Sequence, residues 1–291
     1  MSHGQPPPVR AFLRRCVLAV CVLDEVDVDP DDTGVHVPGC APLGWDEVAA
    51  AAGVAPGSPA PTGSGEPGAA ARSRVRQLLL AHRELHRSRA RRVALAVPRG
   101  ADRHPGSGWA AEPLLGGALD LGPGVVVAHD GVERTLPVPA ASARATGAAP
   151  ALTAQQREHL EAMGALAVQR LQRDAGARGD GVLRPVGGCD VPTLLAAASL
   201  REHLVAGSVM RAVAVPDRTR GWFDLARVDP AFVVAAWAVT DPADRGLRRP
   251  VLVTREEVAP APTAPDLRGT GGAGGSGDWG SGDVARAVLR L

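Results

Sequence analysis

Four amino-acid types are absent from this chain of 291 residues: lysine, asparagine, isoleucine and tyrosine. Phenylalanine and methionine occur only three times each, whereas alanine, glycine, proline, arginine and valine are abundant. The missing residues have AT-rich codons, so the pattern indicates a bacterium with a GC-rich genome. Because lysine is absent, all 32 Lys and Arg positions are arginine. The arginine content therefore reflects codon usage and does not by itself indicate phosphate recognition.

The chain also lacks a strong charge of either sign and a long apolar run. Its formal net charge of +1 gives no general attraction to nucleic acid or anionic lipid. The apolar run at 231–239 is far shorter than the roughly 20 residues of a membrane span. The four cysteines contain no CxxC pair, which disfavours a zinc cluster and a disulfide scaffold. We therefore expect a cytoplasmic protein without a cofactor.

Hydrophobic periodicity predicts both helices and strands. Apolar residues at helical spacing indicate helices over 9–23, 45–52, 71–90 and 153–176. Short Val-rich runs predict strands at 93–97, 182–186, 209–215 and 251–253, and hairpins at 26–37 and 124–138. The expected fold class is α+β, with helices packed on a mixed sheet and a core of Ala, Val and Leu.

Two further segments carry specific expectations. Asp229 and Pro230 are a strong helix start, and the residues that follow are apolar nearly all round. A helix of that kind is expected in the centre of the fold. Residues 140–150 show no clear period and are expected to be a loose connection.

Composition divides the chain into five segments. These are a helix–hairpin–helix segment at 1–54, a Pro/Gly/Ser-rich linker at 55–70, the main α+β domain at 71–258, a Gly/Pro-rich tail at 259–282 that is expected to be disordered, and a short amphipathic segment at 283–291. In the last segment Val284, Val288 and Leu291 share one helical face. A tethered amphipathic segment can dock on another protein, so these three residues are candidates for partner binding.

The helix at 71–90 contains the candidate metal ligands. His82 and His86 are four residues apart, so both lie on one face of the helix and could hold an ion. Glu84 lies between them and points elsewhere, so the motif is not the HExxH of metalloproteases. The sequence offers no evident third ligand, and no bound metal is expected.

The stretch GGCD at 187–190 contains the candidate nucleophile, Cys189. It precedes an expected helix, and the positive end of a helix can lower the pKa of a thiol. His159 or His203 would have to approach as the base. In the alternative interpretation, the two glycines form a tight turn, Asp190 caps the helix and Cys189 fills space in the core. The carboxylate of Asp190 also works against a thiolate.

The stretch DEVAAAAGVAPGSPA at 46–60 resembles the helix-turn-helix of LacI-type repressors. The resemblance implies DNA binding through residues 44–63, which the basic helix at 71–92 could support. The pattern departs from the family at Pro59, Pro61 and Gly63, which fall where the recognition helix would continue. The arginines of 71–92 are equally consistent with a solvated helix face.

Three stretches of the second half, VLRPVGGCDVPTLL, RGWFDLARVDPAF and DPADRGLRRPVLVTREEV, resemble an uncharacterised family of actinobacterial proteins. The resemblance implies no activity. We therefore expect a non-enzymatic cytoplasmic binding or scaffold protein that uses its C-terminal segment. The alternatives are a DNA-binding regulator and a thiol enzyme that uses Cys189. Nothing in the sequence identifies an oligomeric state.

Overall fold

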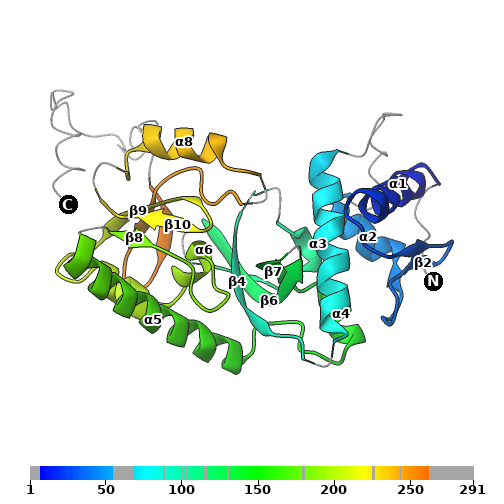
Figure 1. Cartoon of the computed structure of the whole chain (residues 1–291), viewed down its shortest axis with the longest axis horizontal. Coiled ribbons are helices and arrows are strands. Elements are labelled where there is room, and N and C mark those ends of the chain that lie inside the picture. The colour runs from blue at the N-terminus through cyan, green and yellow to red at the C-terminus, as the bar shows by residue number, and fades with distance from the viewer. Residues whose placement is uncertain are drawn as a thin grey trace, which may run out of the picture.

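A computed structural model provides the structure of this chain between Pro7 and Ala261. The described residues are 7–54, 68–87, 89–99, 101, 104–114, 117–129, 131–178, 181–224, 227–242 and 244–261. Figure 1 shows α1, α2 and α3 at one end of the molecule and α5 and α8 at the other, with β4, β6 and β7 between them. The predicted segment 283–291 lies outside the described residues.

The N-terminal part combines three helices with a small antiparallel sheet. The helices are α1 (Pro7–Leu23), α2 (Trp45–Ala52) and α3 (Ala69–Leu85), and the strands are β1 (Asp29–Pro30), β2 (Gly34–His36) and β3 (Leu43–Gly44). The predicted helices at 9–23 and 45–52 are confirmed, as is the first hairpin. Asp31 closes that hairpin, because its carboxylate accepts hydrogen bonds from the backbone N–H groups of Thr33 and Gly34.

A second antiparallel sheet lies in the middle of the molecule. Its strands are β4 (Arg92–Pro98), β5 (Glu112–Pro113), β6 (Leu119–His129) and β7 (Val132–Pro137). β6 pairs with the other three, and its hairpin with β7 confirms the prediction at 124–138. Val125, Val127 and Leu136 pack in one core with α1, α2 and α3. Residues 9–54 therefore share a core with this sheet, while the domain boundaries drawn from composition remain a prediction.

The C-terminal part consists of four helices and a third antiparallel sheet. The helices are α5 (Ala154–Arg178), α6 (Val191–Leu194), α7 (Ala198–Leu204) and α8 (Pro230–Val239), and the strands are β8 (Val182–Leu183), β9 (Arg211–Asp217), β10 (Arg220–Trp222), β11 (Val251–Val253) and β12 (Val258–Pro260). The strand order is β12-β11-β9-β10-β8. The predicted α+β class is confirmed. The strand pairs of the described residues are all antiparallel, so the expected mixed sheet is replaced by three antiparallel ones.

Side chains of the C-terminal part bind backbone groups of β4, which is the outer strand of the central sheet. The backbone N–H of Ala96 donates to Thr193 Oγ1 at 2.9 Å, and Gln156 Nε2 donates to the carbonyl of Val93 at 3.0 Å. A buried strand edge needs such partners, because each unpaired backbone group costs free energy. Gln156 also completes the predicted capping box with Thr153 at the start of α5. These bonds connect the central sheet to the C-terminal helices.

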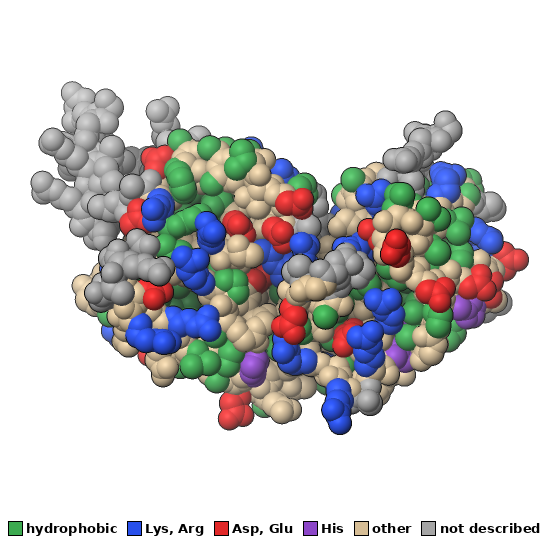
Figure 2. All heavy atoms as spheres, viewed as in Figure 1, with side chains coloured by type: hydrophobic (Ala, Val, Ile, Leu, Met, Phe, Trp, Pro, Cys, Tyr) green, Lys and Arg blue, Asp and Glu red, His purple; other side chains and the backbone are tan. Residues whose placement is uncertain are grey.

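The prediction that α8 lies in the centre of the fold is wrong. Val233 is fully buried, but Phe232, Val234 and Val239 are 38%, 40% and 87% exposed. The helix packs on β9 at the surface, and Figure 2 shows hydrophobic side chains gathered at its position. Hydrophobicity on all sides leads to burial only where a second layer covers the helix, and the outer face of α8 stays exposed to solvent. Within the described ranges, no helix combines the length and the apolar character that crossing a bilayer requires.

Candidate functional site

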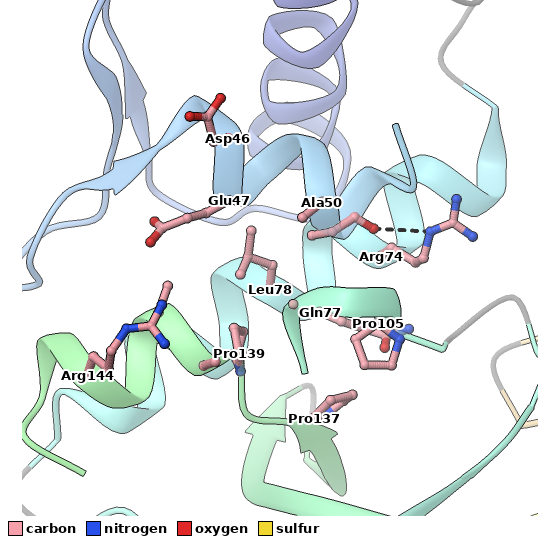
Figure 3. A pocket seen from close by; sticks show the side chains of 14 residues that line it. Asp46, Glu47, Ala50, Arg74, Gln77, Leu78, Pro105, Pro137, Pro139 and Arg144 are labelled. Carbon is pink, nitrogen blue, oxygen red and sulfur yellow. Dashed lines mark hydrogen bonds between the residues drawn. The ribbon is translucent and has the colours of Figure 1, made fainter. Parts of the chain in front are cut away.

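A cleft of about 330 Å³ lies between the N-terminal helices and the central sheet (Figure 3). α2 and α3 form one side of it. The turn at Gly106–Gly108, the end of β7 and helix α4 (Ala140–Ala145) form the other. Most of its surface is apolar, and the apolar residues that line it include Ala50, Leu78, Pro105, Pro137 and Pro139. A volume of this size is at the small end of the range for pockets that bind small molecules.

Hydrogen bonds at the two ends of α2 fix that side of the cleft. At its start, Glu47 Oε2 accepts from the backbone N–H of Gly44 at 2.9 Å. At its end, Gly53 adopts the left-handed conformation that glycine favours, with φ of 77°. Arg74 of α3 donates to the carbonyls of Ala51 and Ala52, at 3.1 and 2.7 Å. These bonds satisfy terminal carbonyls of α2 and hold α2 against α3.

Helix α4 forms the opposite wall, where the sequence predicts a loose connection. The prediction is wrong because Pro139 precedes a short run of alanines that favours a helix. Ser142 and Ala143 are buried and anchor the helix on the N-terminal core. Ala141 and Arg144 lie on the cleft side of the helix.

The charged side chains of the cleft differ in whether they already bind other groups of the protein. Figure 3 shows Glu47 and Arg144 extending from opposite walls at the same end. The carboxylate of Glu47 and the guanidinium of Arg74 already bind backbone groups. Arg144 is exposed, and its side chain has no hydrogen bond or ion pair within the described part of the chain. Its guanidinium therefore keeps its donors available for a ligand.

His82, one of the two predicted metal candidates, is fully buried between α4 and the loop before β3. Its Nδ1 lies 2.9 Å from Ser142 Oγ, and its Nε2 lies 2.7 Å from the carbonyl oxygen of Ala41. Burial lowers the pKa of His82 to about 4, so the ring is neutral near pH 7. Since Nε2 must donate to the carbonyl, Nδ1 accepts from the Ser142 hydroxyl.

His86, the second candidate, binds the backbone of the same residue, Ala41, from one helical turn further on. Its Nε2 accepts from the backbone N–H of Ala41 at 3.1 Å, and its Nδ1 donates to the carbonyl of His82 at 2.9 Å. The two histidines thus bind the N–H and the C=O of Ala41 together. Cys40 lies next to them, and its sulfur with one nitrogen of each ring forms a group within 4.8 Å. No local spacing in the sequence indicates Cys40, because it reaches α3 through the β2–β3 loop.

Cys189, the predicted nucleophile, lies in a tight buried turn. It forms an isolated β-bridge with Val186, and the intervening Gly187 and Gly188 have φ of 58° and 90°. Burial, together with the neighbouring Asp190 carboxylate, raises the pKa of Cys189 to about 12. The thiol is therefore protonated near pH 7, and within the described ranges no histidine forms a hydrogen bond with it. This geometry argues against the nucleophile interpretation and favours the alternative of a glycine turn with a buried cysteine.

Asp190, the residue that follows Cys189, makes structural contacts with Thr193 and Arg218. Its side chain accepts from the backbone N–H of Thr193 at 3.1 Å, which caps α6. The same carboxylate lies 3.0 Å from Nε of Arg218, and both side chains are buried. The carboxylate therefore serves the helix cap and a buried ion pair.

The arginines of the predicted basic helix at 71–92 mostly bind the protein itself. The helix ends at Leu85, and the chain continues into β4. Arg76 pairs with Asp24, and Arg91 pairs with Glu133. These contacts occupy the positive charge that a nucleic-acid interface would need. Residues 55–63, where a recognition helix would run, are not among the described residues.

The remaining predicted site residues, Val284, Val288 and Leu291, also fall outside the described part of the chain. No protein-family model, curated protein or solved structure matches this chain. Three features of the described residues could bind a ligand or a partner: the cleft, the exposed face of α8 and the histidine pair next to Cys40.

Proposed function

We propose that this chain is a non-enzymatic cytoplasmic binding protein whose cleft takes a small amphipathic carboxylate. The observation that carries the proposal is the guanidinium of Arg144, which has no partner among the described residues and lies at one end of an apolar cleft. The apolar walls suit a hydrocarbon or aromatic body. A guanidinium binds a carboxylate through two parallel, charge-assisted hydrogen bonds.

The lining of the cleft favours binding over catalysis. The described residues that line it offer neither a hydroxyl, a thiol nor an imidazole, so a nucleophile or a histidine base would have to come from elsewhere. Glu47 could accept a proton, but its carboxylate already caps α2. Proton transfer through Glu47 would therefore compete with the bond that holds one wall in place.

A ligand screen on the full chain tests the proposal. The probe is a panel of aromatic and branched aliphatic monocarboxylates, followed by the thermal unfolding midpoint and by calorimetry. A carboxylate at about 100 times its Kd stabilises the native state by about 2.7 kcal/mol. Arg144→Ala removes a charge-assisted contact worth about 1.5–3 kcal/mol, which is roughly 10- to 100-fold in Kd.

Two further variants make that result specific to the cleft. Arg14→Ala removes an exposed arginine of α1 and should leave the affinity unchanged. Ala50→Phe fills the cleft from α2 and should abolish binding while the circular dichroism spectrum stays native. If no carboxylate of the panel binds, or if Arg144→Ala binds as tightly as the parent chain, the proposal fails.

The exposed face of α8 favours a second function, which is docking of an apolar segment. We infer that the occupant is the C-terminal segment 283–291 of the same chain. Its Val284, Val288 and Leu291 form an apolar stripe in the sequence. Residues 262–282 connect it to the end of β12, and a chain of roughly 20 residues reaches on the order of 25 Å.

The sheet topology places α8 within that reach. β12 lies two strands from β9, on which α8 packs. Neighbouring strands are about 4.8 Å apart, so the tether starts roughly 10 Å from the strand beneath α8. Docking would cover Phe232 and Val234, which are otherwise exposed to water.

Hydrogen exchange of the α8 amides tests this docking. Exchange in α8 should be slower in the full chain than after deletion of 283–291, and Val284→Ser/Val288→Ser/Leu291→Ser should reproduce the deletion. A matched control, Arg286→Gln/Arg290→Gln, changes the other face and should leave the exchange slow. Identical α8 exchange with and without 283–291 would exclude the segment. Protection that rises with protein concentration would instead identify a second copy as the occupant.

A further inference from the structure

We propose that Cys40, His82 and His86 form a binding site for a zinc-type transition-metal ion. The site is separate from the proposed carboxylate cleft, because none of its three residues lines that cleft. The sequence offers two histidines without a third ligand, and the fold supplies the third from the loop between β2 and β3. A thiolate with two imidazoles is a ligand set that suits zinc.

The three groups are close enough for an ion to join them after a small movement. One ligand atom of each residue lies within 4.8 Å of the other two. Zinc bonds of about 2.0–2.3 Å in a tetrahedral arrangement place ligand atoms about 3.3–3.6 Å apart. The two rings already meet edge to face, with centroids 4.4 Å apart. Closing the site therefore requires shifts on the order of 1 Å.

The outer nitrogen of each ring already faces an oxygen, as in many zinc sites. His86 Nδ1 donates to the carbonyl of His82, which leaves His86 Nε2 with a lone pair. His82 Nδ1 faces Ser142 Oγ, and a hydroxyl can either donate or accept. Oxygen partners of this kind orient the rings of metal-bound histidines and raise their basicity. The structure thus contains the supporting contacts before any ion enters.

The backbone N–H and C=O of Ala41 compete with the ion for the Nε2 atoms of His86 and His82. To bind, His86 Nε2 gives up the N–H of Ala41, and His82 Nε2 gives up its bond to the carbonyl. The His82 proton moves to Nδ1, where Ser142 Oγ accepts it. The Cys40 thiol loses its proton to solvent as sulfur binds the ion. The protein therefore releases one proton for each ion, and no ring becomes charged.

The position of Cys40 allows an ion to enter from solvent. Cys40 is the last residue of a turn, because its N–H donates to the carbonyl of Val37 at 3.0 Å. Within the described residues its sulfur forms one hydrogen bond, a long one of 3.7 Å to the carbonyl of Pro38. Cys40 and His86 are half-buried, whereas His82 closes the inner end. A water molecule can therefore take the fourth position of the ion.

In the alternative explanation the site is purely structural. The two histidines then bind only the backbone N–H and C=O of Ala41, an arrangement that we call the clasp. Both accounts need the imidazoles, but only the metal site needs the sulfur of Cys40. Cys40→Ser keeps the size of the side chain and does not touch the clasp. It is therefore the variant that separates the two accounts.

The experiment titrates the full chain, freed of metal with a chelator, with zinc chloride in a calorimeter and with cobalt(II) in an absorption spectrometer. We expect one zinc ion per chain and a cobalt–thiolate charge-transfer band. Cys40→Ser should remove the band and weaken zinc binding by more than about tenfold, as expected for loss of a direct ligand. His86→Gln should also weaken zinc binding, with the fold checked by circular dichroism.

Two control variants replace a cysteine and a histidine that lie outside the proposed site. Cys21→Ser removes another half-buried thiol, and His36→Gln removes an exposed histidine that contacts Asp31. Both should bind zinc as the parent chain does. Bound zinc should also slow alkylation of Cys40 but not of Cys21. The proposal is overturned if the parent chain binds no zinc, or if Cys40→Ser binds it with unchanged affinity.

Discussion

His104 donates its Nε2 proton to the carboxylate of Asp120, with 2.9 Å between the two atoms. The tautomer follows from the other ring nitrogen, because Nδ1 accepts from the backbone N–H of Gly106 at 3.1 Å. Arg99 donates to the second oxygen of Asp120 at 2.5 Å. The hydrogen bond from Arg99, aided by His104, holds the pKa of Asp120 below its usual range although burial opposes the shift. Asp120 thus connects the β4–β6 edge to the loop before Trp109.

The depressed pKa of Asp120 predicts a pH dependence of stability. In the unfolded chain an aspartate titrates near pH 4. Because the folded pKa is lower, the carboxylate stabilises the fold above that pH, and the contribution is lost as the pH falls through the folded pKa. Asp120→Asn should therefore be less stable near pH 7 and should lose less stability than the parent chain between about pH 5 and pH 3.

Urea unfolding at a series of pH values measures this difference. Asp32→Asn provides the control, because Asp32 is exposed and its side chain forms no hydrogen bond in the described part of the chain. It should leave the pH dependence of the parent chain unchanged. Parallel curves for Asp120→Asn and the parent chain would mean that the ion pair does not stabilise the fold.

Thr193→Val should destabilise the fold by about 1–3 kcal/mol, the cost of a buried polar group without a partner. Thr193 Oγ1 accepts from the N–H of Ala96 and donates to Asp190 Oδ1 at 2.5 Å. Valine has the same shape but leaves both groups without that partner. Chemical denaturation measures the change. The control is Thr219→Val, whose hydroxyl donates to Asp217 on the surface and should cost far less. Equal losses would contradict the role of Thr193 at the β4 edge.

Much of the fold could be predicted from local patterns. The first hairpin, α2 and the capping box of Thr153 and Gln156 depend on residues within a few positions of each other, and each is confirmed. The position of α8 could not be predicted in this way. Its ten residues indicate a helix, but whether a second layer covers a helix depends on distant parts of the chain.

The site was less predictable for the same physical reason. His82 lies in the last turn of α3 and His86 is its C-cap residue, so their spacing alone brings them together. Cys40 is more than 40 residues away, and only the turn after β2 carries it to them. Arg144 gave no signal, because the sequence predicts a connection where α4 forms. A site whose residues come from distant segments of the chain leaves no pattern in any short stretch of sequence.

Thiol reactivity should separate the four free cysteines into two classes. Burial raises the pKa of Cys16 to about 11 and that of Cys189 to about 12, so both are protonated at neutral pH as well as covered. Since the thiolate is the reactive form, these two should react with iodoacetamide only when the chain unfolds. Cys21 and Cys40 are half-buried and should react first. Peptide mass spectrometry after timed alkylation measures the order. Rapid labelling of Cys189 in the native protein would revive the nucleophile interpretation.

The two faces of α8 should respond differently to the same truncation. Val233→Ala removes the two γ methyl groups of a buried side chain, which should lower the free energy of unfolding by about 1–2 kcal/mol. Val234→Ala makes the identical change on the exposed face and should alter the free energy of unfolding by less than about 0.5 kcal/mol. The pair controls for helix propensity, because both positions lie in the interior of α8. Urea unfolding of both variants, made in a chain without 283–291, measures the contrast. If Val234→Ala costs as much as Val233→Ala in that chain, the outer face of α8 is covered by something other than the C-terminal segment.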